Sequence, residues 1–164
     1  MGILIVKEEL VGKFKTAINA YDGVDSFITQ YEKNYLYDLL GVELADLFIA
    51  NLTNKVPVAA RFLALYNVIE LDVYCRLRSA GMKDMLLGFI YFEYQRKQSV
   101  TPTITGNVRS LGENSTNISP DYSPLYLNYN SSISTYQIIQ YYIGENSIDY
   151  PEYNGVSKQK TSII

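Results

Sequence analysis

The sequence predicts a mainly α-helical fold: a small helical bundle with a short β-hairpin or extended arm and a C-terminal helix. Two observations support this prediction. Apolar residues recur at helical spacing through most of the first 98 residues. From residue 99 onward only eight charged residues remain, and Ser, Thr, Asn and Tyr dominate. We therefore expect a helical core domain at residues 1–98 and an arm at residues 99–164, which holds the hairpin, the C-terminal helix and a flexible tail.

Four helices are expected before residue 69, each with an apolar stripe along one face. The first spans Glu8–Ala20. Asp25 or Ser26 can cap the second helix, and Gly41 can end it as a C-cap glycine. Pro57 suits the first turn of the fourth helix. The apolar stripes comprise Leu10, Phe14, Ala17 and Ile18, then Phe27, Ile28, Tyr31, Tyr35 and Leu39, then Leu44, Leu47, Phe48 and Leu52, and finally Phe62, Leu65 and Tyr66.

The stretch Ile69–Arg78 fits two structures. Its apolar and polar residues alternate strictly, which is typical of a strand. The same stretch also continues the helical face of the fourth helix through Ile69, Val73 and Leu77. Because the alternation is strict and β-branched residues contribute to it, we expect a short strand or extended segment.

The clearest helix is predicted at Met82–Lys97. Its segment Met85–Phe92 is apolar almost all round, so neighbouring elements must cover it on several sides. We therefore expect this helix to form the centre of the core.

The arm begins with a predicted β-hairpin. Thr103–Thr105 and Val108–Ser110 form its strands, and Gly106–Asn107 forms its two-residue turn. Further along, the pair Ser123–Pro124 supplies an N-cap and a proline for the first helical position. The helix that follows is expected to extend to about Ile143.

The composition argues against an enzyme. The chain has no histidine, which excludes histidine-based catalytic triads and most zinc sites. Its glycines lack the spacing of a phosphate-binding loop. The single cysteine, Cys75, cannot form an intrachain disulfide and is expected to be a small buried hydrophobic residue. We expect no catalytic residue, no metal and no cofactor.

Two groups of charged residues suggest other functions. A small basic cluster could bind duplex DNA, and it consists of Arg76, Arg78, Arg96 and Lys97. Three acidic residues could hold a metal ion for nucleic-acid cleavage if folding brought them together, namely Glu70, Asp72 and Glu93. We expect most of these side chains to be ordinary solvated charges, since they alternate with core positions.

Nothing in the sequence predicts contact with a membrane. The longest apolar run, Met85–Phe92, is far shorter than the ~18 residues that a spanning helix needs. The apolar stretch Ile3–Val6 is too short for the core of a signal peptide. We therefore expect a protein that is made in a reducing cytoplasm.

The sixteen tyrosines are the strongest functional signal in the sequence. Eight of them lie in the charge-poor arm, and aromatic enrichment with charge depletion is typical of the core of an interface. Biased codon usage, which would raise Tyr, Asn and Ile together, is the alternative explanation. If the arm makes inter-subunit contacts, the candidate residues are Ile104, Val108, Arg109, Tyr122, Tyr126, Tyr129 and Tyr136.

Several segments of the chain resemble one family of viral structural proteins. The main segment is Gly81–Arg96, and the others are Thr105–Arg109, Glu113–Ser115, Tyr141–Ile143 and Tyr150–Gly155. In these segments the sequence resembles the head-to-tail connector proteins (neck or adaptor rings) of tailed bacteriophages, above all those of crAss-like phages. The first sixty residues contribute no motif to this resemblance.

The resemblance implies a structural virion protein without enzymatic activity. Such proteins are small helical bundles with a protruding loop or hairpin, and about twelve copies form a ring below the portal protein. Double-stranded DNA passes through the ring without specific binding, and further neck or tail ring proteins bind its far side. The protein would then be located in the head–tail neck of the virion, after synthesis in the bacterial host cytoplasm. The alternative function is a DNA-packaging accessory protein that binds duplex DNA through the basic cluster.

Overall fold

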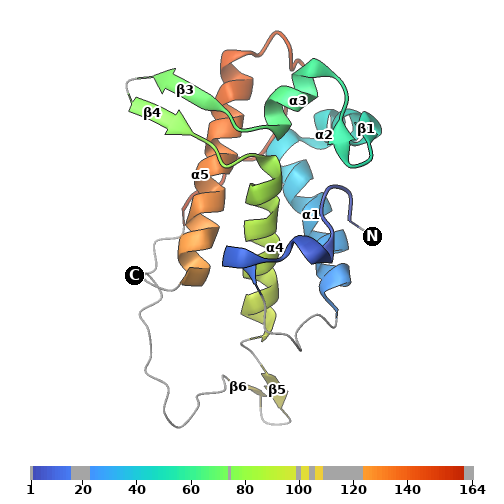
Figure 1. Ribbon diagram of the computed structural model, residues 1–164, viewed down its shortest axis with the longest axis vertical. Helices are drawn as coiled ribbons and strands as arrows, with labels where there is room; N and C mark the ends of the chain where they lie inside the picture. The colour runs from blue at the N-terminus through green and yellow to red at the C-terminus, as the bar shows by residue number, and fades with distance from the viewer. Residues whose placement is uncertain are drawn as a thin grey trace.

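The computed structural model describes residues 2–15, 23–73, 75–98, 101–103, 106–108 and 124–160, most of them in α-helices. The helices are α1 (Val24–Leu40), α2 (Val42–Ala50), α3 (Ala60–Tyr66), α4 (Met82–Gln98) and α5 (Pro124–Glu145) (Figure 1). Two short 3₁₀ turns precede them, η1 (Lys7–Glu9) and η2 (Gly12–Phe14).

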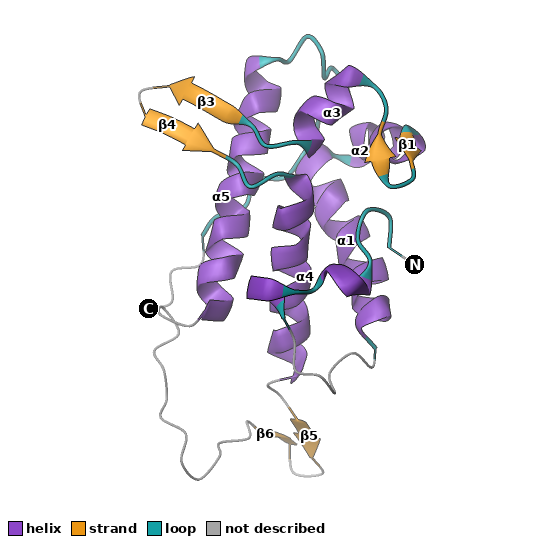
Figure 2. Cartoon of the chain, viewed as in Figure 1, coloured by secondary structure: helices purple, strands orange, loops and turns teal. Residues whose placement is uncertain are grey.

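Three antiparallel hairpins connect or follow helices within the described residues (Figure 2). They pair β1 (Leu52–Thr53) with β2 (Val56–Pro57), β3 (Glu70–Val73) with β4 (Cys75–Arg78), and β5 (Thr101–Thr103) with β6 (Gly106–Val108). This arrangement of helices and small hairpins confirms the mainly α-helical prediction.

Helix α4 lies in the middle of the bundle, between α1 and α5 (Figure 1). Phe89 of α4 is fully buried and stacks on Tyr35 of α1, with 4.2 Å between the ring centroids. The same ring makes edge contacts with Tyr129 and Tyr136 of α5, at centroid distances of 5.5 and 6.2 Å. Neighbours therefore cover α4 on more than one side, which confirms the prediction of a central core helix.

The change in composition at residue 99 does not divide the core. Ile133, Tyr136 and Ile139 of α5 are fully buried, and they belong to the same apolar cluster as Leu36 of α1 and Leu86 of α4. The C-terminal helix is therefore a full member of the bundle.

The N-terminal segment is not the predicted helix Glu8–Ala20. The turns η1 and η2 replace its first half, and residues 16–20 lie outside the described chain. Gly12 has a φ of +61°, a left-handed conformation that interrupts a right-handed helix. Leu10 and Phe14 are nevertheless buried, so their assignment to the core is correct.

The ends of α1 are set by two glycines. Gly23, with a φ of +88°, is the N-cap, so the prediction of Asp25 or Ser26 as the cap is wrong. The Ser26 hydroxyl instead donates to the carbonyl of Gly23 at 2.6 Å. Gly41, with a φ of +81°, ends the helix as predicted, and its N–H donates to the carbonyl of Tyr37 at 2.9 Å.

Pro57 does not lie in the first turn of α3. It pairs with Leu52 in the β1–β2 hairpin, and α3 starts three residues later. The side-chain oxygen of Asn51 accepts the N–H groups of Val58 and Ala59, at 2.9 and 2.8 Å. These two bonds fix the chain just before α3 and so decide where that helix begins.

Glu70–Val73 and Cys75–Arg78 are extended, as the alternation predicted, but they form two strands instead of one. Strands β3 and β4 face each other with Glu70 opposite Arg78 and Leu71 opposite Leu77. A strict alternation gives the same pattern in one long strand and in two short strands, so it did not reveal the reversal of the chain.

The hairpin predicted after α4 exists, but its register differs. Thr101 pairs with Val108 and Thr103 pairs with Gly106. Gly106 and Asn107 therefore belong to a strand, and the prediction that they form the turn is wrong. Residues 104 and 105, between the strands, lie outside the described chain.

A buried carboxylate fixes the N-terminal segment to α1. Glu32 is 0% exposed, and it accepts hydrogen bonds from the backbone N–H groups of Ile3, Leu4 and Ile5, the last at 2.9 Å. Lys55 holds the same segment by donating to the carbonyl of Ile5 at 3.3 Å. Burial raises the pKa of Glu32 above its ordinary value, and the three N–H groups and Lys55 oppose that shift.

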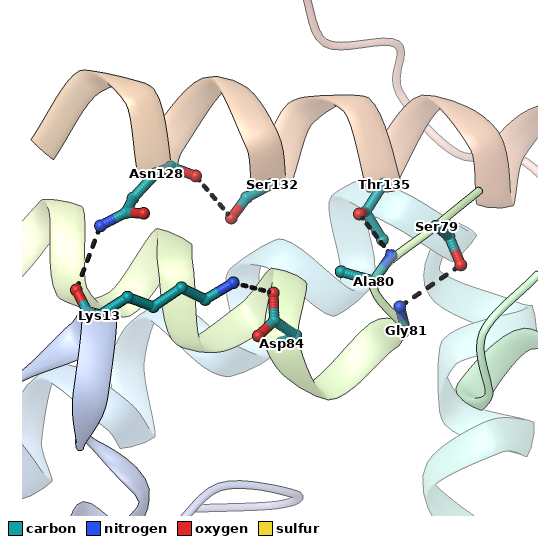
Figure 3. A network of polar contacts seen from close by, with 8 residues as sticks. All are labelled: Lys13, Ser79, Ala80, Gly81, Asp84, Asn128, Ser132 and Thr135. Atoms are coloured by element: carbon teal, nitrogen blue, oxygen red, sulfur yellow. Dashed lines mark hydrogen bonds and ion pairs between the residues drawn. The ribbon is translucent and has the colours of Figure 1, made fainter. Parts of the chain in front are cut away.

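Gly88 allows α4 and α5 to approach closely. A Cβ atom at this position would lie 2.0 Å from the Ser132 Oγ atom and 3.5 Å from the carbonyl oxygen of Asn128. The Ser132 hydroxyl donates to that carbonyl at 3.1 Å, within α5 (Figure 3). The contact therefore leaves no room for a side chain on α4.

We expect Gly88→Ala to lower the free energy of unfolding by about 1–3 kcal/mol, because the added methyl group overpacks the contact. Adding Ser132→Ala should recover part of the loss, since it removes the hydroxyl that the methyl group meets. Urea unfolding of the single and double variants measures both effects. The control is Gly144→Ala in α5, where no atom lies within 4 Å of the new Cβ. A Gly88→Ala variant as stable as the wild type would contradict the close contact.

The raised pKa of Glu32 predicts a pH-dependent effect of Glu32→Gln. Between the ordinary value, 4.5, and the raised value, the folded protein binds more protons than the unfolded chain. The unfolding free energy of the wild type minus that of Glu32→Gln should therefore decrease as the pH rises through this window. Urea unfolding at a series of pH values measures the difference, and Glu43→Gln on the surface controls for the loss of one charge. A difference that grows with pH would refute the predicted sign.

Candidate assembly surface

The predicted contact residues of the arm are only partly covered by the structure. Ile104, Arg109 and Tyr122 lie outside the described chain. Val108 lies in β6, where the structure describes the backbone alone. The assignment of these four residues to an inter-subunit interface stays a prediction.

Tyr126 and Tyr129 lie in the first two turns of α5 and are half-buried. Both pack on Phe92 near the C-terminal end of α4, at ring centroid distances of 5.5 and 4.3 Å. Because β5 follows the same end of α4, these tyrosines and the β5–β6 hairpin belong to one end of the bundle. Each tyrosine keeps part of its surface available for a neighbour.

Tyr136, in contrast, belongs to the interior of its own chain. Its side chain is fully buried, and its hydroxyl donates to the carbonyl of Val156. Burial raises the pKa of the Tyr136 hydroxyl well above its ordinary value. In this structure Tyr136 therefore has no exposed surface that could contact a neighbouring subunit, contrary to the prediction.

Polar residues of α5 bind other segments of the same chain. The Thr135 hydroxyl oxygen accepts the N–H of Ala80 at 3.0 Å, and so fixes the loop between β4 and α4 (Figure 3). Ser79 secures the same loop, because its hydroxyl oxygen accepts the N–H of Ile69 at 2.8 Å. The Asn128 amide donates to the carbonyl of Lys13 at 3.2 Å, and so contacts the N-terminal segment (Figure 3).

The segment after α5 is also held by side chains of the bundle. The amides of Gln137 and Gln140 donate to the carbonyls of Lys158 and Val156, at 2.9 and 3.0 Å. The Lys158 ammonium lies 2.8 Å from the carboxylate of Asp38 in α1. The last nine residues are expected to form the flexible tail, but two of them, Val156 and Lys158, are bound to side chains of the bundle.

The basic residues of the predicted cluster do not form one patch. Arg78 ends β4, whereas Arg96 and Lys97 lie at the opposite end of α4, a helix of 17 residues or about 25 Å. Arg78 pairs with Glu70 at 3.3 Å, and Arg96 pairs with Glu93 at 2.6 Å. The side chain of the fourth member, Arg76, is outside the described part of the structure.

The three acidic residues considered as metal ligands are also separated. Glu70 and Asp72 lie on β3, whereas Glu93 lies near the far end of α4, where it accepts a hydrogen bond from the Tyr35 hydroxyl at 3.0 Å. In the described ranges, no group of three or more His, Cys, Asp or Glu residues could hold a metal ion. The side chain of Cys75, predicted to be buried, is not described.

The β3–β4 hairpin is a surface feature that the alternating pattern of residues 69–78 does not predict. It projects from the bundle beside α5 (Figure 1). Its acidic residues, Glu70 and Asp72, lie on β3, and its basic residues, Arg76 and Arg78, lie on β4. The signal in the sequence is the order of the charged residues, two acidic residues and then two basic ones at alternating positions, which becomes meaningful only because β3 and β4 pair with each other.

None of the described helices is long and apolar enough to cross a membrane. No protein-family model, no curated protein and no solved structure matches this chain.

Proposed function

We propose that this chain is a non-enzymatic structural virion protein, a head-to-tail connector whose copies form a ring below the portal of a tailed phage. The observation that best supports this proposal is the placement of two hairpins. Strands β3–β4 precede the N-terminus of α4, and β5–β6 follow its C-terminus, so each subunit carries small protruding elements at both ends of its central helix (Figure 1). A connector has to bind one partner on each side, and this arrangement provides two different ends.

The helical bundle that lies between the two hairpins is held together by one shared core. One apolar cluster joins α1, α4 and α5, and side chains of α5 hold the N-terminal segment, the β4–α4 loop and the C-terminal segment. Neighbouring subunits of a ring contact each other through two different surfaces. The ring closes when the rotations between successive subunits add up to one full turn. A well-packed helical bundle with different elements at its two ends can provide these two different surfaces.

The surface charges fit a ring through which DNA moves without being bound. The formal net charge is −3, and strong binding of phosphates needs clustered cations. Arg78 and Arg96 are ion-paired and lie near opposite ends of α4, so the alternative of a DNA-binding packaging protein gains no support from them.

The proposal predicts ring-shaped oligomers of the full chain, either alone or on the portal protein. Native mass spectrometry should detect closed oligomers of about twelve copies. Negative-stain images of the chain mixed with portal rings should show added density on one face of the portal. A protein that stays monomeric and never associates with portal rings would refute the proposed function. Salt-sensitive retention of duplex DNA by such a monomer would support the packaging alternative.

The β5–β6 end of the subunit should be required for incorporation into the ring. Deletion of residues 103–111 should leave the far-UV spectrum and the melting temperature of the bundle nearly unchanged, because α4 and α5 hold each other through the core. Ring formation measured by native mass spectrometry should be lost. The control is Gly144→Ala, an exposed position that should assemble like the wild type. Rings formed by the deletion variant would show that this hairpin makes no essential contact.

A further inference from the structure

We propose that the β3–β4 hairpins of adjacent copies join edge to edge, with β4 of one copy beside β3 of the next. This inference rests on the proposed ring and names the surface that would link its subunits. The occupant of each hairpin edge is therefore a second copy of this chain.

In the described part of the chain, no further strand lies on either edge of the hairpin. Among the described residues, β3 and β4 have only each other as strand partners. The N–H of Ser79 donates to the carbonyl of Ile69 at 2.9 Å, which makes these two residues a hydrogen-bonded pair. Bonded and non-bonded pairs alternate along an antiparallel ladder, so the pairs Glu70–Arg78 and Asp72–Arg76 have backbone groups that face outward. Such groups are a template for another strand.

The charges of the two edges are opposite. Strand β3 contributes Glu70 and Asp72 to its edge, and strand β4 contributes Arg76 and Arg78. If hairpins are repeated side by side in the same register, acidic residues of one copy stand opposite arginines of the next. Opposite charges across neighbouring strands are stabilising, whereas like charges directly opposite each other are destabilising.

The charge pattern also selects the direction of the contact. A symmetric dimer through two β4 edges would place arginines against arginines, and one through two β3 edges would place carboxylates against carboxylates. Only the contact between β4 and β3 is complementary. That contact is heterologous, so each copy donates one edge and accepts another, which is the geometry that a closed ring needs.

The rest of the hairpin leaves its charged side open to solvent. Glu70, Asp72 and Arg78 are exposed, whereas Leu71 is partly buried against the core. Leu77 lines a surface pocket of about 300 Å³ together with Ile138 and Tyr141 of α5. Leu71 therefore anchors the hairpin to the core, Leu77 remains exposed, and the base of the hairpin is secured through the bonds of Ser79 and Thr135.

Charge reversal tests the proposal. One variant carries Glu70→Arg and Asp72→Arg, a second carries Arg76→Glu and Arg78→Glu, and a third carries all four changes. Each double variant makes both edges of its own hairpin alike in charge, so we expect at least about tenfold weaker self-association. Each also removes the Glu70–Arg78 ion pair within the hairpin, so the far-UV spectrum and melting temperature of each variant are compared with those of the wild type, and the decisive result is the behaviour of the mixture. An equal mixture of the two double variants restores complementary edges between unlike copies and should assemble. The fourfold variant should assemble like the wild type.

Sedimentation velocity and native mass spectrometry, with and without portal rings, measure the assembly of each variant and of the mixture.

A disulfide test detects the same contact with smaller changes. In a Cys75→Ser background, one chain carries Glu70→Cys and another carries Arg78→Cys. We expect oxidation of the mixture to give crosslinked dimers of unlike chains, because residues 70 and 78 stand opposite each other across the proposed contact. Either chain alone should give at most about one tenth of that yield, since like edges repel each other. Equal yields from the single chains and from the mixture would overturn the proposal.

The outcomes separate this inference from the proposed function. If the wild type forms rings and the double variants form them equally well, the hairpin contact is refuted and the connector function stands. A mixture that fails to assemble although the wild type does would refute the hairpin contact in the same way. If the wild type forms no oligomer with or without portal rings, both proposals are refuted.

Discussion

The close packing of α5 on α4 is the constraint on which the rest of the structure depends. It requires Gly88, since any side chain there would meet Ser132. Once the two helices are in place, Phe89 can touch Tyr35 of α1 on one side and α5 on the other. Three helices from distant parts of the chain thereby share one core, and every surface element is positioned relative to it.

The polar and aromatic composition of the second half has a role inside the subunit. Thr135, Gln137 and Gln140 bind backbone groups of the β4–α4 loop and of the C-terminal segment. Tyr136 is buried, whereas Tyr126 keeps part of its surface exposed. Buried polar groups need partners, and Thr135 finds one in the N–H of Ala80, while the partly exposed Gln137 and Gln140 bind carbonyls of the C-terminal segment. Aromatic enrichment of the arm therefore reflects internal packing as well as any contact between subunits.

The proposed assembly follows from what protrudes from this core. The β3–β4 hairpin carries acidic residues on one strand and basic residues on the other, and the β5–β6 hairpin lies at the other end of α4. When the two edges of a hairpin carry opposite charges, two copies of the hairpin have complementary charges only if β4 of one lies beside β3 of the other. Under the proposed function, both hairpins would take part in the contacts between neighbouring copies, the first through its two strand edges and the second from the opposite end of the subunit.

The sequence by itself determined the helical class, the extent of α4 and the start of α5, because 3.6-residue periodicity and the proline at a helix start are local properties. It also determined that the residues of β3 and β4 are extended, but not that these two strands pair with each other, because alternation is identical in both cases. Only the tertiary structure decided that Tyr136 is internal and that Glu32 holds the N-terminal segment. Both depend on contacts between residues far apart in the chain. Tyr126 and Tyr136 look alike in the local sequence, and no local pattern encodes that only the second is fully covered by another segment.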